Sequence, residues 1–258
     1  MINASNYFSR ENTLNYMSVS QFKSFEKCEF SALEEVNGRY SRAESTALLV
    51  GSYVDAYYEG TIDLFVANHP EIRKKDGTLK ADYVQAKLLI ERLKRDKLFS
   101  KYMSGEKQVV MTGEIEGVAV KIKIDSYHPG KAIVDLKVMR DFKPIYVPAA
   151  GRLNFIEAWR YDLQGAVYQE IVKQNTGETL PFYIAGATKE ATPDLAIFEI
   201  PQENLDVQLD LFRANVRRYQ LIKEGAIEPI RCEHCECCKD SKKLERITTW
   251  EELNNYEL

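Results

Sequence analysis

The alternation of hydrophobic and polar positions is clearest in the middle of the chain, where it predicts short strands. From Val118 to Ile124 every second residue is aliphatic, the period-two pattern of a strand with one buried face. A turn rich in Ser, Pro and Gly follows, and residues 132–138 form a second aliphatic run. Similar runs predict strands over residues 108–113, 182–188 and 196–200. The middle of the chain is therefore expected to contain a sheet.

Hydrophobic positions three and four residues apart predict helices on both sides of these strands. The helices are expected over residues 18–36, 45–60, 61–68, 81–95, 153–174 and 201–224. In the helix 153–174 the expected buried stripe consists of Ile156, Trp159, Leu163 and Val167. This order of elements, with helices first and strands then interleaved with long helices, indicates an α/β fold.

Two acids and a lysine stand at polar positions of the central strands. Asp125 directly follows the first aliphatic run, and Asp135 lies within the second, two residues before Lys137. Residues two apart on a strand share a face, so Asp135 and Lys137 point the same way, and Asp125 comes alongside if the strands pair across the turn. Carboxylates on neighbouring strands suit hard cations such as Mg²⁺, and an ammonium can stabilise charge on a phosphate under attack. These residues are a candidate metal site; the alternative is an ordinary strand with a surface ion pair.

Two of the predicted helices carry polar residues that share a face. Asp55 and Glu59 lie four residues apart in the helix 45–60, where they are either ligands or a solvated acidic face. In the helix 153–174, a polar and aromatic stripe lies beside the buried one. It consists of Glu157, Arg160, Tyr161, Gln164 and Tyr168. Such a stripe is either an ordinary helix surface or one wall of a site.

Composition and charge narrow the class of protein. A chain of 258 residues with 45% hydrophobic content can bury one large core or two small ones. The formal net charge of −4 does not by itself support a nucleic-acid partner, although a local patch or a ring of subunits can concentrate positive potential. No apolar run approaches the roughly 20 residues that span a bilayer, and the first residues lack the regions of a signal peptide. We expect a cytosolic protein without membrane contact.

Four of the five cysteines lie close together within residues 232–238. This clustering favours metal binding in a reducing compartment over a disulfide framework. Cys28 stands on or beside the apolar stripe of the helix 18–36, where a buried structural thiol is the alternative. His234 and Cys237 lie in the same C-terminal segment, and the sequence does not assign either of them a role in metal binding.

Taken together, these motifs resemble the PD-(D/E)XK nucleases, in particular the RecB-like branch and its phage exonucleases similar to exonuclease VIII (RecE). Asp125 matches the first motif acid, and VDLK supplies Asp135 and Lys137 as the (D/E)xK motif. Gln164 and Tyr168 match the QxxxY motif of the following helix. The three motifs occur in the family's order, and the resemblance covers most of the chain.

The resemblance implies a single nuclease domain over residues 1–258. Residues 1–106 would form a mainly helical N-terminal part. Residues 107–225 would form the catalytic α/β core, a central mixed sheet flanked by helices. Residues 226–258 would form a Cys-rich C-terminal segment. The GSYVDAYYEG stretch resembles an upstream motif that usually carries a metal-binding His, and here Asp55 occupies that position.

The resemblance also implies an activity and its ligands. Asp55, Asp125, Asp135 and the Leu136 carbonyl would hold one or two Mg²⁺ or Mn²⁺ ions that polarise the scissile phosphate and lower the pKa of an attacking water. Lys137 would position that water or stabilise the charge on the phosphate, and Gln164 with Tyr168 would fix Lys137 or contact a DNA phosphate. The substrate would be the ends of double-stranded DNA, digested 5′ to 3′ in phage-type recombination by a homo-oligomer with a single-strand annealing partner, in a bacterial host cytosol.

A second metal centre follows from the same resemblance. Some RecB-like nucleases clamp an iron–sulfur cluster with one early and three late cysteines, a pattern that Cys28, Cys232, Cys235 and Cys238 fit. A [4Fe-4S] cluster is the first expectation, Zn²⁺ the second and a metal-free tail the third. Two other function classes stay open: a nuclease-fold DNA-binding or structural module without activity, and a different hydrolase that uses the same carboxylates.

Overall fold

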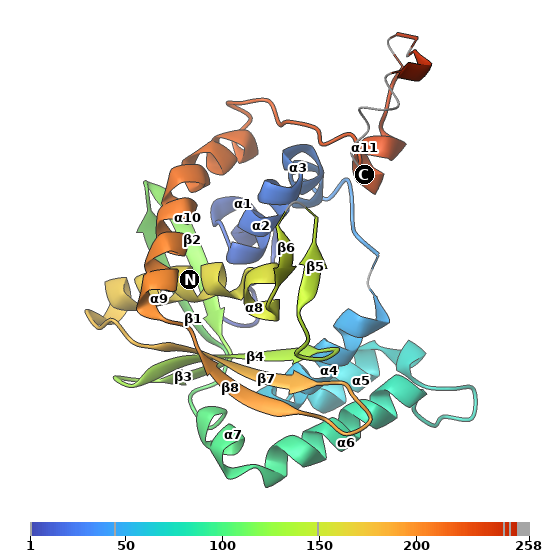
Figure 1. Cartoon of the computed structure of the whole chain (residues 1–258), viewed down its shortest axis with the longest axis vertical. Helices are drawn as coiled ribbons and strands as arrows, with labels where there is room; N and C mark the ends of the chain where they lie inside the picture. Colours follow the sequence, from blue (N-terminus) through green and yellow to red (C-terminus); the bar gives the residue numbers. More distant parts are fainter. Residues whose placement is uncertain (1, 44, 149, 245, 248, 252–258) are drawn as a thin grey trace.

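A four-stranded mixed sheet lies at the centre of the computed structural model, which describes residues 2–251 except 44, 149, 245 and 248 (Figure 1). Its strands are β3 (Ser126–His128), β4 (Ala132–Met139), β7 (Phe182–Thr188) and β8 (Leu195–Glu199), in the order β3-β4-β7-β8. β4 and β7 run parallel, and the outer pairs are antiparallel. Helices cover both faces, so the predicted fold, a central mixed sheet flanked by helices, is confirmed.

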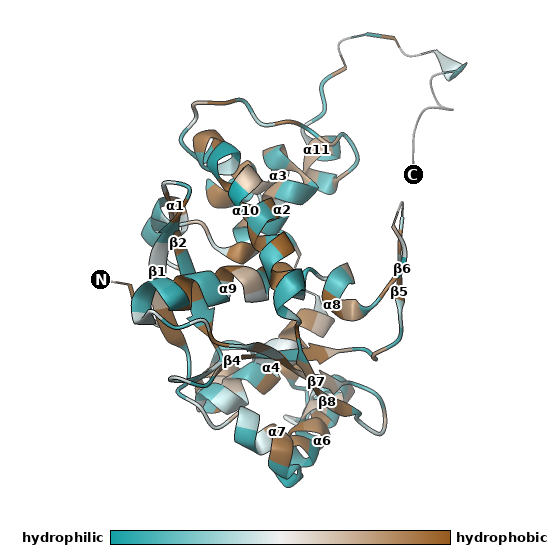
Figure 2. Ribbon diagram, turned by 60° about the vertical axis from the view of Figure 1, so that its left-hand side comes forward, coloured by the Kyte–Doolittle hydropathy of each residue, from teal (hydrophilic) through white to brown (hydrophobic). Residues whose placement is uncertain are grey.

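The alternation along β4 divides the interior into two cores. Val134 and Leu136 pack with one helical layer, which consists of α4 (Thr46–Glu59), α6 (Ala81–Arg95) and α7 (Lys97–Tyr102). Ile133 faces the other core, which contains α2 (Val19–Lys27), α9 (Tyr161–Thr176) and α10 (Gln202–Lys223). Asp135 and Lys137 have the parity of Ile133 and therefore project toward the α9 side. Figure 2 shows hydrophobic residues along the sheet and on the helices that flank it.

The predicted pairing of the two acid-bearing strands differs from the observed one. β2 (Val118–Ile124) pairs with β1 (Val109–Ile115) in a separate hairpin, and β3 is the strand that pairs with β4 across the turn. The β1–β2 turn consists of Glu116 and Gly117, both with positive φ, as two-residue hairpin turns require. Asp125 lies at the junction where the chain passes from one sheet to the other.

Two of the predicted helices are interrupted. The segment 18–36 forms α2 and α3 (Glu29–Val36), because Cys28 has an extended backbone and caps α3 through its own Sγ, which accepts a hydrogen bond from the Ser31 N–H. The segment 153–174 forms α8 (Phe155–Ala158) and α9, because Arg160 adopts a left-handed backbone with φ of 55°. Trp159, predicted to be buried, is 51% exposed at this break, so that prediction is wrong.

The remaining elements are short. They are α1 (Arg10–Asn15), α5 (Ile62–Asn68), the 3-10 turn η1 (Pro70–Ile72), β5 (Ile145–Val147), β6 (Gly151–Leu153) and α11 (Glu236–Asp240). β5 and β6 form a hairpin, which stands at the side of the molecule in Figure 2. Among the described residues, no helix combines the length and apolarity needed to cross a membrane.

Candidate active site and cysteine cluster

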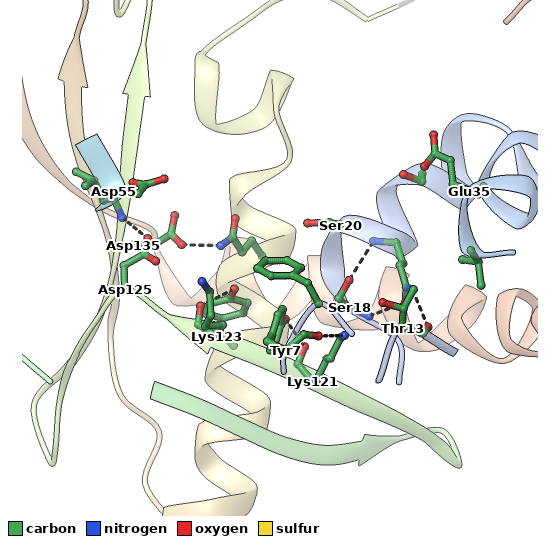
Figure 3. Close-up of a pocket in the computed structure, with 18 of the residues that line it drawn as sticks. Tyr7, Thr13, Ser18, Ser20, Glu35, Asp55, Lys121, Lys123, Asp125 and Asp135 are labelled. Carbon is green, nitrogen blue, oxygen red and sulfur yellow. Dashed lines mark hydrogen bonds between the residues drawn. The ribbon is translucent and has the colours of Figure 1, made fainter. Parts of the chain in front are cut away.

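A cavity of about 550 Å³ opens between the β1–β2 hairpin, the end of α4 and the N-terminal helices (Figure 3). All the predicted active-site residues line it: Asp55, Asp125, Asp135, Leu136, Lys137, Gln164 and Tyr168. Lys121, Lys123 and Glu59 line it as well. Residues from α4, from the β2–β3 junction, from β4 and from α9 therefore meet in one pocket, as the motifs predict.

Asp125 reaches the second strand through a backbone hydrogen bond. Its Oδ2 accepts from the Leu136 N–H at 3.0 Å, and its Oδ1 accepts from the Gln108 side chain at 3.3 Å. The acid thus lies alongside β4 although its own preceding strand does not pair with β4. The kink between the two sheets brings Asp125 beside Asp135.

Asp135 is the most deeply buried of the three acids. Its Oδ1 accepts a hydrogen bond of 2.6 Å from the Gln164 side-chain amide. Its Oδ2 forms an ion pair with the Lys137 ammonium, whose Nζ lies 2.5 Å away. Burial, reinforced by Asp125 and opposed by Lys137, raises the pKa of Asp135 to about 6. Asp135 thus lies in a group of carboxylates with Asp125 and Asp55, with Lys137 beside it, and carboxylate oxygens are the ligands that a hard cation prefers.

Asp55 approaches the same place from the last turns of α4. Burial, with a further contribution from the charge of Asp125, raises its pKa well above the ordinary value. Glu59, one turn later, pairs instead with Lys123 at 3.7 Å. The two acids of α4 therefore differ: one faces the other carboxylates, and the other holds a lysine of the opposite wall.

Lys137 keeps its positive charge in this setting. Burial disfavours the charged form, but Asp135 and Asp125 outweigh it and raise the pKa of Lys137 above its usual value. The Lys137 ammonium also lies 5.1 Å from the ring centroid of Tyr161. A second lysine, Lys23, lies 5.2 Å from the same ring, and burial together with Lys137 lowers its pKa to about 7.

The two residues of the QxxxY motif form hydrogen bonds with groups other than Lys137. Gln164 binds Asp135, and the buried hydroxyl of Tyr168 donates to the Lys123 carbonyl at 3.0 Å. Both side chains hold the strands that carry the acids. Neither of these hydrogen bonds involves Lys137, and the other predicted role, contact with a DNA phosphate, stays a prediction.

Two lysines that line the pocket, and a third that lies near Lys137, were not recognised in the sequence. Lys121 and Lys123 stand at the polar positions of β2, which the alternation assigns to the outside of a sheet, yet both line the pocket. Lys121 is 2% exposed. Lys23 lies on α2, far from the motifs in sequence, and no local pattern marks it.

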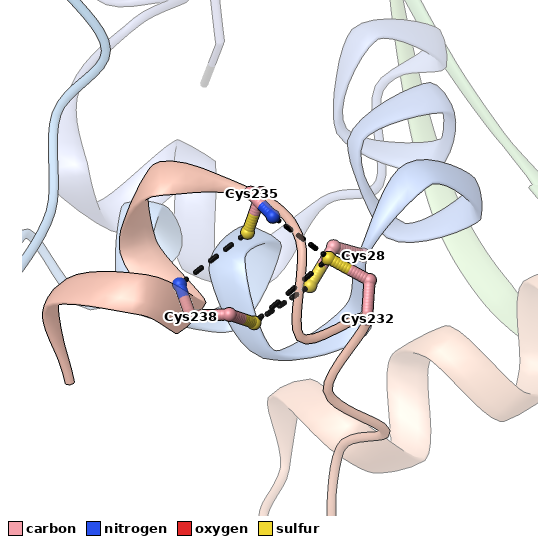
Figure 4. Close-up of side chains that lie close together, drawn as sticks. All are labelled: Cys28, Cys232, Cys235 and Cys238. Atoms are coloured by element: carbon pink, nitrogen blue, oxygen red, sulfur yellow. Dashed lines mark hydrogen bonds between the residues drawn. The ribbon is translucent and has the colours of Figure 1, made fainter. Parts of the chain in front are cut away.

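The four predicted cysteine ligands converge at the far end of the N-terminal helices (Figure 4). The Sγ atoms of Cys28, Cys232, Cys235 and Cys238 all lie within 4.8 Å of one another. Cys28 and Cys238, which are 210 positions apart in sequence, have their sulfurs at 3.6 Å. Within the described part of the chain, this is the one group of three or more potential ligands so close together.

Backbone N–H groups surround these sulfurs. The N–H groups of Cys235 and Cys238 point at the Sγ atoms of Cys232 and Cys235, at 3.3 and 3.4 Å. Burial opposes ionisation of Cys232, but hydrogen bonds from the backbone of His234 and Cys235 lower its pKa to about 6. Cys237 is buried beside the cluster but is not one of its four members. The arrangement suits thiolate ligands of a metal.

Comparison with known proteins indicates the same superfamily as the sequence motifs do. The model of a family described as "PDDEXK-like domain of unknown function (DUF3799)" matches residues 18–241. The crystal structure of a "Putative exonuclease" from Eubacterium rectale is 48% identical, covers 100% of this chain and 99% of its own, and has a TM-score of 0.95. No curated protein matches the sequence. Because the family model covers most of the chain and the fold carries the predicted motifs, the chain belongs to this PDDEXK-like family and so to the PD-(D/E)XK nuclease superfamily.

Proposed function

We propose that this protein is a divalent-metal-dependent exodeoxyribonuclease that hydrolyses phosphodiester bonds of linear double-stranded DNA. The observation that carries the proposal is the position of Asp135, which is buried between Gln164 and Lys137 and lies close to the carboxylates of Asp125 and Asp55. Membership of the superfamily and the similarity to a "Putative exonuclease" support it.

The carboxylates supply the ligands for a hard cation. Asp55, Asp125 and Asp135, with the Leu136 carbonyl, would hold Mg²⁺ or Mn²⁺, which prefer oxygen ligands. Such an ion polarises the scissile phosphate and lowers the pKa of an attacking water. Burial is the main cause of the raised pKa values of Asp55 and Asp135, and repulsion from Asp125 adds to it; a bound cation would favour the charged form of both acids.

Lys137 acts in this scheme as a cation and not as a base. Because its neighbours raise its pKa, it stays protonated at neutral pH and can donate hydrogen bonds to a phosphate oxygen as negative charge develops there. Gln164 and Tyr168 would be positioning residues: the first orients Asp135, and the second fixes the strand that carries Lys123.

The pocket continues away from the acids along a wall suited to a nucleic-acid backbone. In Figure 3 the acids lie at one end and Glu35 at the other, with Ser18, Ser20 and Thr13 between them. Hydroxyl and amide side chains are common phosphate contacts. This wall gives the substrate strand a path even though the chain has a net charge of −4.

The cysteine cluster would hold a structural metal. A zinc ion with Zn–S bonds of about 2.3 Å places tetrahedral sulfurs about 3.8 Å apart, and the closest sulfurs here lie at 3.6 and 3.9 Å. A [4Fe-4S] cluster fills the space between its thiolates and requires wider separations. The spacing therefore favours one Zn²⁺ over the iron–sulfur cluster that the motif pattern suggests first. Protein purified anaerobically distinguishes them: colourless protein with one zinc per chain supports Zn²⁺, and brown protein with iron supports the cluster.

Three finer features of the proposal rest on the resemblance to phage exonucleases. They are 5′ to 3′ polarity, cooperation with a single-strand annealing protein, and a homo-oligomer that encloses DNA. The oligomer has a physical motive as well, because an acidic monomer grips DNA poorly while a ring can concentrate its basic residues. Light scattering tests the oligomer, and duplexes labelled at either 5′ or 3′ ends test the polarity.

The central experiment compares linear and circular duplex DNA with Mg²⁺, Mn²⁺ or EDTA. An exonuclease digests the linear form only, and only with metal. Asp125→Ala, Asp135→Ala and Lys137→Ala should each abolish digestion while the protein stays folded, whereas Asp210→Ala, at an exposed acid of α10, serves as the control. DNA binding without digestion by the wild type would instead favour the alternative, a nuclease-fold DNA-binding module.

A further inference from the structure

The segment that precedes residue 18 forms part of the pocket, although it lies outside the matched family region. Two of its aromatic residues, Tyr7 and Phe8, line the pocket together with the predicted metal ligands. Nothing in the catalytic scheme above uses them. The pocket therefore places two aromatic side chains beside the groups that are proposed to bind a phosphate.

The segment is fixed firmly to β2. The buried Lys121 donates to the Tyr7 carbonyl at 2.6 Å, and its ammonium lies 4.5 Å from the Tyr7 ring centroid. The Tyr7 hydroxyl in turn donates to the Lys121 carbonyl at 3.3 Å. Farther along, Met17 pairs with the same strand through two backbone hydrogen bonds with Ala119 and Lys121. Tyr7 is therefore an anchor, and the backbone that carries Phe8 is held in place.

Phe8 itself is left open to solvent. Its side chain is 75% exposed, and its ring contacts that of Tyr7 edge-on, with centroids 5.0 Å apart. The Lys123 ammonium lies 5.2 Å from the Phe8 ring, and the same ammonium pairs with Glu59 at the edge of the acid cluster. An exposed phenylalanine ring is thus held one side chain away from the groups that would bind the scissile phosphate.

We propose that Phe8 is a substrate-positioning residue that stacks on the nucleobase next to the scissile phosphate. This inference rests on the proposed nuclease function. Base stacking on aromatic side chains is sequence-tolerant, because every base has a π face. Inside a duplex both faces of each base are covered by neighbouring bases, so the ligand that Phe8 fits is a terminal or unpaired base. Phe8 would therefore select DNA ends.

The test uses linear duplexes in which a single abasic residue replaces each of the terminal bases in turn. On intact DNA, Phe8→Ala should raise KM about 10-fold and change kcat little, since stacking is worth about 1–3 kcal/mol per base. Phe8→Trp should restore the wild-type KM. On the duplex that lacks the stacked base, wild type should show the same raised KM and Phe8→Ala should add nothing to it. This dependence on one base is not expected from a structural defect.

Tyr146→Ala is the matched control, because Tyr146 is an aromatic residue of the β5–β6 hairpin that is 72% exposed and does not line this pocket. Its KM should equal that of wild type. Anisotropy of labelled DNA ends measures binding without turnover, in an Asp135→Asn background with and without Phe8→Ala. If wild-type protein digests no DNA, the proposed function fails, and the binding comparison still decides the role of Phe8. Equal behaviour of Phe8→Ala and its parent, or an equal loss on every abasic duplex, would overturn the inference.

Discussion

The carboxylate pocket and the cysteine cluster bring together ligands in opposite ways. The carboxylates come from α4, from the β2–β3 junction and from β4, and burial raises the pKa values of Asp55 and Asp135. Two of the four cysteines lie at helix caps, where a backbone N–H group points at the sulfur: Cys28 caps α3 and Cys235 caps α11. The pocket gathers carboxylates for the proposed cation and substrate, whereas the cluster joins Cys28 to Cys238, which lies 210 positions further along the chain.

This contrast predicts that the two groups fail differently when they are altered. Variants of the pocket should lose activity and keep their fold. Variants of the cluster should lose stability and keep the activity of whatever fraction stays folded. The strongest effect is expected in the pocket, because transition-state charge is stabilised only there.

Asp135→Asn should lower kcat/KM for linear duplex DNA by at least about 10³-fold. The amide keeps the shape of the side chain but removes the charge that binds metal, while the midpoint of thermal unfolding of the metal-free protein changes little. Initial rates of digestion and a thermal scan measure the two quantities. Asp210→Asn, at a solvent-exposed acid, should leave both unchanged. Substantial activity in Asp135→Asn would show that the Asp135 carboxylate is not needed for catalysis.

Cys28→Ser should lower the free energy of unfolding of the metal-loaded protein by about 3 kcal/mol or more, because metal binding contributes directly to folding free energy. Cys237→Ser is the matched control, since Cys237 is also a buried thiol of this region but is not one of the four clustered sulfurs, and its cost should be near 1 kcal/mol. Denaturant titrations with and without a chelator measure the difference. Equal stability of the two variants would show that the four cysteines do not share a metal.

The fold and the grouping of the site residues could be predicted because their signals are local. Alternation marks β2 and β4, helical spacing marks α6, and the acids stand at strand positions whose facing follows from parity alone. The resemblance to the PD-(D/E)XK nucleases then implies that these motifs lie together in one site. The shared face of Asp135 and Lys137 follows from parity alone, whereas Asp125 reaches β4 by a bend between two sheets and not by the predicted strand pairing.

The features that escaped prediction depend on tertiary contacts. The break at Arg160 has no local cause: its guanidinium binds Glu26 of α2 and Gln208 of α10, both remote in sequence. The break at Cys28 accompanies the contact with Cys238. Lys121 follows a polar pattern that predicts exposure, but the N-terminal segment covers it. In each case a partner far along the chain overrides the local pattern.

Gln164→Leu should raise the Mg²⁺ concentration needed for half-maximal activity by about 10- to 100-fold, the usual cost of losing a group that orients a metal ligand. The reason is the 2.6 Å hydrogen bond to Asp135, which fixes the carboxylate. A purely structural role for Gln164 would lower the folded fraction without moving the metal dependence, so a Mg²⁺ titration separates the two. Gln169→Leu is a suitable control, because Gln169 lies on the same helix and binds Leu180 and Gln202 instead.

The smallest effect is expected for the pH dependence of stability at Lys121, whose buried ammonium donates a hydrogen bond to Tyr7 in the pocket wall. Burial lowers its pKa to about 8, and nearby Lys223, also buried, has its pKa lowered to about 8. Because the folded-state pKa lies below the unfolded value of about 10.5, the unfolded chain binds more protons between these values, and stability from this group rises with pH from about 8 to 10.5. Because solvent and the contacts with Tyr7 screen this charge, wild type should gain only on the order of 1 kcal/mol relative to Lys121→Met over this range, and none below pH 7. Denaturant unfolding of both proteins at pH 7, 8, 9 and 10 measures the difference, and a parallel pH dependence would show that Lys121 is not a costly charge.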